Sequence, residues 1–156
     1  MTEGTKQSID LKGRVPQPYI AIEGPIGVGK TTLARQLADL FDYQLLLEDA
    51  HENPFLSKFY ENRRQNALAT QLFFLFQRVQ KIDDLKQQDL FRPLRVADFL
   101  IDKDPLFAQV NLDADEYELY SKVYSQMTVD APTPDLVIYL QASVDRLLER
   151  IDRRGI

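Results

Sequence analysis

The segment AIEGPIGVGKTT, from Ala21 to Thr32, concentrates the residue types that bind phosphate groups. Its central part, from Gly24 to Thr31, matches the pattern G-x-x-x-x-G-K-[ST] and stands between an apolar run and a helical pattern, as that motif requires. The glycines let successive backbone N–H groups surround phosphate oxygens, Lys30 can reach the β and γ phosphates, and the Thr31 hydroxyl can bind Mg²⁺. The predicted ligands are a nucleoside triphosphate and Mg²⁺, and the residues predicted to form the phosphate site are Gly24, Pro25, Ile26, Gly27, Val28, Gly29, Lys30, Thr31 and Thr32.

A phosphate loop alone does not distinguish a kinase from a motor protein or a GTPase, because one fold supports many functions. The guanine-specifying motif N-K-x-D is absent from the sequence, which counts against a GTPase. Glu48 ends the second apolar run, and it would lie beside the phosphate loop if the first two strands are near neighbours. A carboxylate at that place can accept a proton from a hydroxyl group. The alternative is an acid at a strand end that contacts only solvent.

Three side chains of the longest helical pattern could line a pocket for a nucleobase. Gln71 and Arg78 are seven residues apart, hence two helical turns along one line, and Phe74 lies between them on the same side. These residues border the apolar face of the helix. An ordinary boundary between core and solvent has the same pattern, with Phe74 as a core side chain, so the spacing leaves both interpretations open.

The elements that would position these residues alternate along the chain. Short and nearly continuous apolar runs predict strands at 19–23, 43–48, 94–100 and 135–142. Helical patterns follow the phosphate loop, span about 65–90, begin at Asp113, and begin again with Ser143 as N-cap. One face of the 65–90 pattern carries Leu68, Leu72, Leu75, Val79 and Ile82. Strands that alternate with helices predict a three-layer α/β fold, here a P-loop NTPase fold with a parallel sheet between helices.

Composition sets further bounds on function. The chain has 156 residues, 44% of them hydrophobic, which is the size and composition of one globular domain. Its net charge of -5 argues against a nucleic-acid polymer as partner. No run is long enough for a membrane span, residues 1–18 read as a polar leader, and the absence of cysteine fits a reducing compartment. We therefore expect a cytoplasmic protein that contacts no membrane.

Five segments resemble the deoxynucleoside kinase family, and most closely its bacterial deoxyadenosine/deoxyguanosine kinase branch. They are YIAIEGPIGVGKTTLARQLA, LEDAHENPFLSKFY, TQLFFLFQR, DFLIDKDPLF and LVIYLQASVDRLLERIDRRGI, in this order from residue 19 to residue 156. The order and spacing of the segments make the resemblance more specific than the phosphate loop alone. It implies a kinase domain over 19–156 that phosphorylates the 5'-hydroxyl of a deoxyribonucleoside with ATP.

The resemblance also implies roles for single residues. Glu48 stands at the position of the general base that activates the 5'-hydroxyl, and Tyr60 at that of the tyrosine that contacts the sugar 3'-hydroxyl. The positions that read the base are Gln71, Arg78 and Asp104, with Phe74 as a candidate stacking platform. The positions that close over the phosphates are the lid arginines Arg150 and Arg154, which together with Lys30 and Glu48 form the predicted catalytic set. Without the resemblance, the two arginines would also fit the solvated face of an amphipathic helix.

An amide can form two hydrogen bonds with adenine, so the predicted pocket favours deoxyadenosine, with deoxyguanosine and deoxycytidine behind it. The resemblance further implies a homodimer packed through helices, and the apolar face of the 65–90 helix would permit this but could also be buried within one domain. Two alternatives to the nucleoside kinase remain at this stage. One is a nucleoside monophosphate kinase such as a thymidylate kinase, and the other is a nucleotide-binding module without catalytic activity.

The sequence departs from the family pattern in two places. The family has an acid followed by Arg and then Ser or Thr, whereas this chain has Asp98-Phe99-Leu100. Asp98 can still help Thr31 to hold the metal, but the arginine that would neutralise the transferring phosphoryl group is missing. The lid motif R-x-x-x-R-G-R is followed only as far as Gly155, so we expect the chain to lack the C-terminal part of the lid and the elements that follow it.

Overall fold

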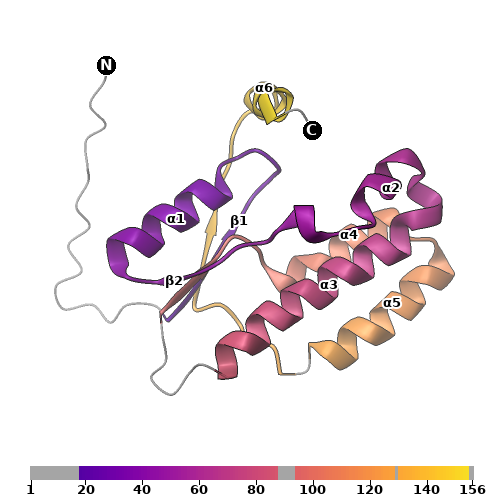
Figure 1. Ribbon diagram of the computed structural model, residues 1–156, viewed down its shortest axis with the longest axis horizontal. Coiled ribbons are helices and arrows are strands. Elements are labelled where there is room, and N and C mark those ends of the chain that lie inside the picture. Colours follow the sequence, from indigo (N-terminus) through magenta and orange to yellow (C-terminus); the bar gives the residue numbers. More distant parts are fainter. Residues whose placement is uncertain (1–17, 88–93, 129, 155–156) are drawn as a thin grey trace.

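The computed structural model describes residues 18–87, 94–128 and 130–154, and Figure 1 shows their arrangement. The predicted leader, apart from Pro18, and the predicted end of the long helix near residue 90 lie outside the described residues. The side chains of residues 85–87 and Arg154 are also outside them. No helix in the described ranges is long and apolar enough to cross a membrane.

Four parallel strands form one sheet in the order β2-β3-β1-β4. The strands are β1 (Tyr19–Glu23), β2 (Gln44–Leu46), β3 (Arg95–Ala97) and β4 (Leu136–Tyr139). In the register of the sheet, Ala21 of β1 lies opposite Ala97 of β3 and Val137 of β4. All strand predictions are confirmed in place, but three of the strands are shorter than predicted because their last residues turn into the loops that carry Glu48, Asp98 and the segment before the last helix.

One face of the sheet packs against α1 (Lys30–Phe41). Strand residues alternate between faces, and Ile20, Ile22 and Val96 all point to the α1 side, where they form a buried cluster with Ala34. Leu33 and Leu37 of the same helix pack against this cluster from outside. Figure 1 shows α1 on one side of the sheet and α3 (Arg63–Gln87), α4 (Asp104–Asn111) and α5 (Ala114–Met127) on the other.

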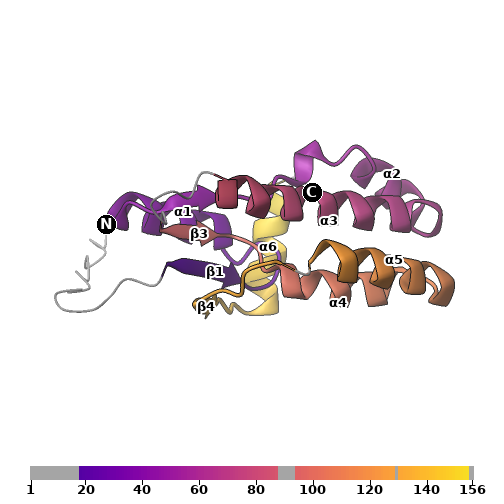
Figure 2. The ribbon, with the colours of Figure 1, turned by 90° about the horizontal axis from the view of Figure 1, so that it is seen from below.

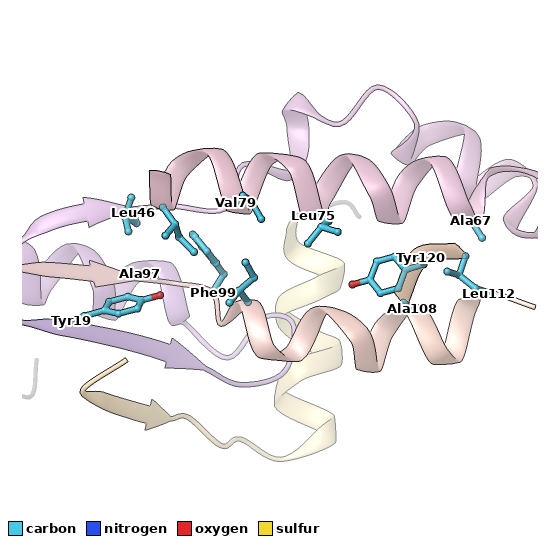
Figure 3. Close-up of a cluster of buried hydrophobic side chains, with 12 residues drawn as sticks. Tyr19, Leu46, Ala67, Leu75, Val79, Ala97, Phe99, Ala108, Leu112 and Tyr120 are labelled. Atoms are coloured by element: carbon cyan, nitrogen blue, oxygen red, sulfur yellow. The ribbon is translucent and has the colours of Figure 1, made fainter. Parts of the chain in front are cut away.

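The opposite face begins a second core that continues past the sheet between helices (Figure 3). These helices are α3, α4 and α5, with the short α2 (Leu56–Glu61) packed on α3. The buried members of this core are Tyr19, Leu46, Ala67, Leu75, Val79, Ile82, Ala97, Phe99, Ile101, Ala108, Leu112 and Tyr120. Figure 2 shows α3 in one layer and α4 with α5 in the next. The sheet therefore lies between helices, as predicted.

The apolar face of α3 is buried within the domain. Leu75, Val79 and Ile82 are buried in the second core, and Leu68 and Leu72 pack against it. Of the two interpretations left open for this face, the structure shows burial within one domain. The face is therefore not available for packing between subunits.

The predicted helix starts are also observed. Asp113 caps α5 by accepting a hydrogen bond from Glu116 N–H at 2.9 Å, while the Glu116 carboxylate accepts one from Asp113 N–H at 3.2 Å. Ser143 accepts a longer bond of 3.4 Å from Arg146 N–H at the start of α6 (Val144–Arg154). Two short 3₁₀ helices, η1 (Ala50–Glu52) and η2 (Ile101–Lys103), follow β2 and β3. They lead from the sheet into the α-helices that complete the site.

Candidate active site

The phosphate loop joins the carboxyl end of β1 to α1, and its shape depends on glycine. Gly24, Gly27 and Gly29 have φ values of 153°, 81° and 107°, which side chains with a Cβ rarely adopt. No side chain caps the N-terminus of α1, which begins directly after Gly29. The first amides of the helix therefore form a ready site for an anion, with the helix dipole adding partial positive charge.

Gly24 is the glycine whose replacement should be most harmful. A Cβ there would lie 2.7 Å from the Leu140 carbonyl oxygen and 2.9 Å from Val28 Cγ1, whereas a Cβ on Gly29 would meet no atom within 4 Å. We expect Gly24→Ala to lower the free energy of unfolding by about 2 to 4 kcal/mol and Gly29→Ala by about 1 kcal/mol, because both strain φ but only the first forces β4 and the loop apart. Urea denaturation of the two variants measures the difference, and equal losses would contradict the proposed packing.

Lys30 and Thr31 point to different sides of the loop. The Lys30 ammonium group donates a hydrogen bond of 2.7 Å to the Gly24 carbonyl, and burial lowers the pKa of Lys30. The Thr31 hydroxyl donates to Asp98 Oδ2 at 2.7 Å, and Asp98 Oδ1 accepts from Glu48 N–H, also at 2.7 Å. Burial raises the pKa of Asp98, and these two hydrogen bonds oppose the rise. Asp98 thus connects the start of α1 to the loop after β2.

Thr31 and Asp98 form a donor set that suits Mg²⁺. A hydroxyl and a carboxylate within hydrogen-bond distance supply hard oxygen ligands, and Mg²⁺ usually takes only one or two carboxylates beside water and substrate phosphates. The residues of the described ranges include no group of three or more acids or histidines that could hold a metal alone. The residues present fit a metal that is shared with a bound phosphate.

The strand order corrects one assumption made from the sequence. Glu48 was expected beside the phosphate loop if β1 and β2 were near neighbours, but β3 lies between them. Glu48 is nevertheless connected to Thr31, because Asp98 after β3 accepts hydrogen bonds from the Glu48 backbone N–H and from the Thr31 hydroxyl. The carboxyl ends of three parallel strands therefore meet at one edge of the sheet, which is where α/β proteins bind ligands.

Charged side chains connect Glu48 to helices α3 and α4. Arg78 of α3 donates hydrogen bonds to Glu48 Oε1 and to Asp104 Oδ1, and the Phe74 ring lies 5.2 Å from its guanidinium carbon. The Gln71 amide donates to Asp104 at 3.2 Å. Asp104 is fully buried, and Arg78 and Gln71 are 9% and 6% exposed. The structure therefore brings together the residues predicted to read the base and joins them to the predicted general base.

The remaining predicted residues lie differently. Tyr60 of α2 is 57% exposed, and the centre of its ring lies 5.8 Å from that of Phe59. Arg150 donates hydrogen bonds to the carbonyl oxygens of Gly27 and Val28 at 3.1 and 3.0 Å, so its guanidinium group contacts the phosphate loop. The side chain of Arg154 lies outside the described residues. The phosphate-closing role of both arginines stays a prediction.

Sequence reasoning missed three residues of the site. The hydroxyl group of Tyr120 in α5 donates a hydrogen bond to Asp104 Oδ2, and burial raises the pKa of Tyr120. Glu23, the last residue of β1, accepts a hydrogen bond from Gly24 N–H and forms an ion pair with Lys103. The place of Glu23 directly before the phosphate loop was a signal in the sequence, but nothing in the sequence connected Lys103 or Tyr120 to the site.

A parallel sheet, a phosphate loop between its first strand and first helix, and acids at the neighbouring strand ends place the chain in the P-loop NTPase class. Comparison with known proteins gives the family. The sequence model described as deoxynucleoside kinase matches residues 20–156, so the chain belongs to the deoxynucleoside kinase family. This confirms the resemblance drawn from the five segments, and it favours a nucleoside kinase over a thymidylate kinase.

Individual relatives agree with this assignment. The chain is 41% identical to a deoxyguanosine kinase from Bacillus subtilis over 88% of its own length and 67% of that protein. It is 31% identical to a deoxyadenosine kinase from Lactobacillus acidophilus, covering 87% of this chain and 66% of that protein. The chain thus spans about two thirds of the length of these curated relatives.

Solved structures show the same fold. A deoxyadenosine kinase from M. mycoides with dCMP and dCDP bound superposes with a TM-score of 0.76 at 27% sequence identity, over 88% of this chain and 71% of that chain. The same enzyme with bound dATP gives a TM-score of 0.75 at 27% identity, over 88% of this chain and 72% of that chain. These neighbours confirm the P-loop NTPase fold.

Proposed function

We propose that this chain transfers the γ-phosphoryl group of ATP to the 5'-hydroxyl of a deoxyribonucleoside, with Mg²⁺ bound at Thr31 and Asp98. One observation carries the proposal. Asp98 links the phosphate loop to Glu48, and Arg78 links Glu48 to the polar side chains of α3 and α4. The candidate phosphate site and the candidate nucleoside pocket are therefore both connected to Glu48.

In the proposed reaction, the 5' oxygen bonds to the γ-phosphorus, the bond from that phosphorus to ADP breaks, and Glu48 accepts the hydroxyl proton. Phosphoryl transfer needs little covalent help, so the protein mainly aligns its two substrates and neutralises charge. Lys30 and the amides of α1 hold the phosphates, Arg78 orients the Glu48 carboxylate, and Arg150 steadies the loop. Mg²⁺, when bound, offsets phosphate charge.

The preferred base is a purine. The amide of Gln71 suits the amino group and N7 of adenine, whereas an arginine suits O6 and N7 of guanine, so Gln71 and Arg78 fit either base. The relatives divide in the same way, since one is named a deoxyguanosine kinase and another a deoxyadenosine kinase. Deoxyadenosine stays our first candidate, with deoxyguanosine next and deoxycytidine behind them.

A substrate screen tests this proposal. ADP release is measured with ATP, Mg²⁺ and each of the four deoxynucleosides in turn. We expect turnover with deoxyadenosine or deoxyguanosine at least tenfold above that with thymidine. A strong preference for thymidine would contradict the proposed pocket, and tight ATP binding without any ADP release would favour a module that only binds nucleotides.

We also propose a cytoplasmic homodimer. The apolar face of α3 is occupied, but α4 exposes Leu106 (59%) and Val110 (83%), four residues apart on one side of the helix. Burial of these two side chains between subunits would remove apolar surface from water, which favours association. The reducing cytoplasm suits a chain without cysteine and supplies ATP.

Sedimentation equilibrium measures the oligomeric state. We expect a mass of about twice the 18.1 kDa of the chain for the wild type, and a monomer for Val110→Glu, because the new carboxylate would be desolvated in the interface. Leu40→Glu, at a side chain of α1 that is 73% exposed, should leave the dimer intact. A monomeric wild type or a dimeric Val110→Glu variant would contradict the proposed contact.

A further inference from the structure

Lys103 is a second lysine at the phosphate loop. It is the last residue of η2, and its ammonium group lies 2.5 Å from Glu23 Oε1. The same oxygen accepts a hydrogen bond of 2.8 Å from Gly24 N–H, and Lys30 donates to the Gly24 carbonyl at 2.7 Å. The first residue of the loop therefore lies between two ammonium groups.

Gly24 and Glu23 connect the two lysines. Lys103 pairs with Glu23 Oε1, the same oxygen accepts from Gly24 N–H, and the Gly24 carbonyl accepts from Lys30. Like charges that are linked through so few groups repel each other, and a polyanion that contacted both ammonium groups would offset the repulsion.

Lys103 is partly open to solvent. Its side chain is 27% exposed, and beside the ion pair with Glu23 its ammonium group lies 5.5 Å from the centre of the Phe107 ring. A lysine has four flexible carbons and a compact charge, and it can change partner without a backbone movement. Phe99, directly after Asp98, is 3% exposed in the second core and brings no charge to the phosphates.

We propose that Lys103 is a second phosphate-binding cation of this site, which leaves Glu23 and contacts the transferring phosphoryl group when ATP binds. Glu23 positions Lys103 beside Gly24 in the absence of nucleotide. The inference rests on the proposed kinase function, because its main consequence is a faster transfer step. A cation that contacts the transferring phosphoryl group neutralises charge in the transition state, which is a major contribution to this chemistry.

Lys103→Met tests the proposal by removing the charge while keeping most of the chain length. We expect kcat to fall by about 10² to 10³, with KM for the deoxynucleoside within threefold of wild type, because the contact forms with the phosphoryl group and not with the acceptor. Lys103→Arg should retain kcat within about tenfold of wild type. Lys122→Met, which removes a lysine paired with Glu118 on the exposed side of α5, should leave kcat unchanged.

A double variant separates the missing cation from a disturbed Glu23. If Lys103→Met slowed turnover only because the Glu23 carboxylate was left without its partner, then adding Glu23→Gln would restore kcat. The oxygen of the new amide could still accept the hydrogen bond from Gly24 N–H. We expect Lys103→Met/Glu23→Gln to stay as slow as Lys103→Met. Recovery to within threefold of wild type would overturn the inference.

A binding measurement distinguishes failure of the inference from failure of the proposed function. Calorimetry with ADP and with a non-hydrolysable ATP analogue requires no turnover. We expect Lys103→Met to weaken binding of the ATP analogue by at least fivefold and binding of ADP by less than twofold. An active wild type with an equally active Lys103→Met variant overturns only the inference. An inactive wild type overturns the kinase function. If Lys103→Met also binds both ligands as tightly as the wild type does, the role of Lys103 is overturned as well.

Discussion

Glu48→Gln is expected to lower kcat for deoxynucleoside phosphorylation by about 10² to 10⁴, the range by which a positioned general base accelerates a reaction. The amide keeps the size and the hydrogen-bonding oxygen of the carboxylate but cannot accept the hydroxyl proton. The backbone N–H of residue 48 still donates to Asp98, so the connection to Thr31 persists. The dissociation constant of ATP should therefore stay within about threefold of wild type, as measured by calorimetry.

Glu52→Gln is the matched control for this variant. Glu52 lies four residues further along the same segment and its carboxylate accepts a hydrogen bond of 3.0 Å from Gln77 of α3, whereas the Glu48 carboxylate pairs with Arg78. We expect its kcat to equal that of the wild type. Unchanged turnover in Glu48→Gln would remove Glu48 from the active site and leave the proposed reaction without a base.

Arg78→Met should cause the largest loss of stability. The substitution leaves Asp104, which is fully buried, without its guanidinium partner, while Gln71 and Tyr120 still donate hydrogen bonds to its carboxylate. Breaking a buried ion pair by removing one partner costs about 3 to 5 kcal/mol. We expect a loss of this size in the free energy of unfolding, together with a KM for the deoxynucleoside raised by at least tenfold.

A double-mutant cycle separates the pair from its surroundings. Asp104→Asn removes the charge that Arg78 neutralises, so Arg78→Met/Asp104→Asn should recover at least half of the stability lost in Arg78→Met. Lys122→Met breaks an exposed i,i+4 pair with Glu118 and should have no measurable effect on unfolding. A double variant as unstable as the sum of the two single variants would show that Arg78 and Asp104 are not coupled.

Much of the fold could be predicted because its signals are local. The apolar run of β1, the glycines of the phosphate loop and the capping pair Asp113 and Glu116 each act within a few residues of sequence. The strand order could not be predicted in the same way. The place of β3 between β1 and β2 depends on which faces the helices cover, and the alternation of strands and helices does not determine it.

The candidate site likewise combines features with local sequence signals and features that depend on long-range contacts. The residues that contact phosphate follow from one contiguous motif, whereas the ion pairs of Arg78 join residues 26 and 30 positions apart, and that of Lys103 joins residues 80 positions apart. Helical spacing placed Gln71 and Arg78 on one line but could not show that Asp104 and Glu48 would meet them. Contacts of this kind depend on tertiary packing, here on the position of α3 at the carboxyl edge of the sheet.

The most direct measurement is the fate of the γ-phosphoryl group. Labelled ATP is incubated with the protein and either deoxyadenosine or its 5'-deoxy analogue, and the products are identified by mass spectrometry and phosphorus NMR. The proposed reaction predicts 5'-monophosphate from deoxyadenosine and no labelled nucleoside product from the analogue, with ADP formed only in the first case. Equal ADP release with both compounds, or label on any oxygen other than the 5' oxygen, would contradict it.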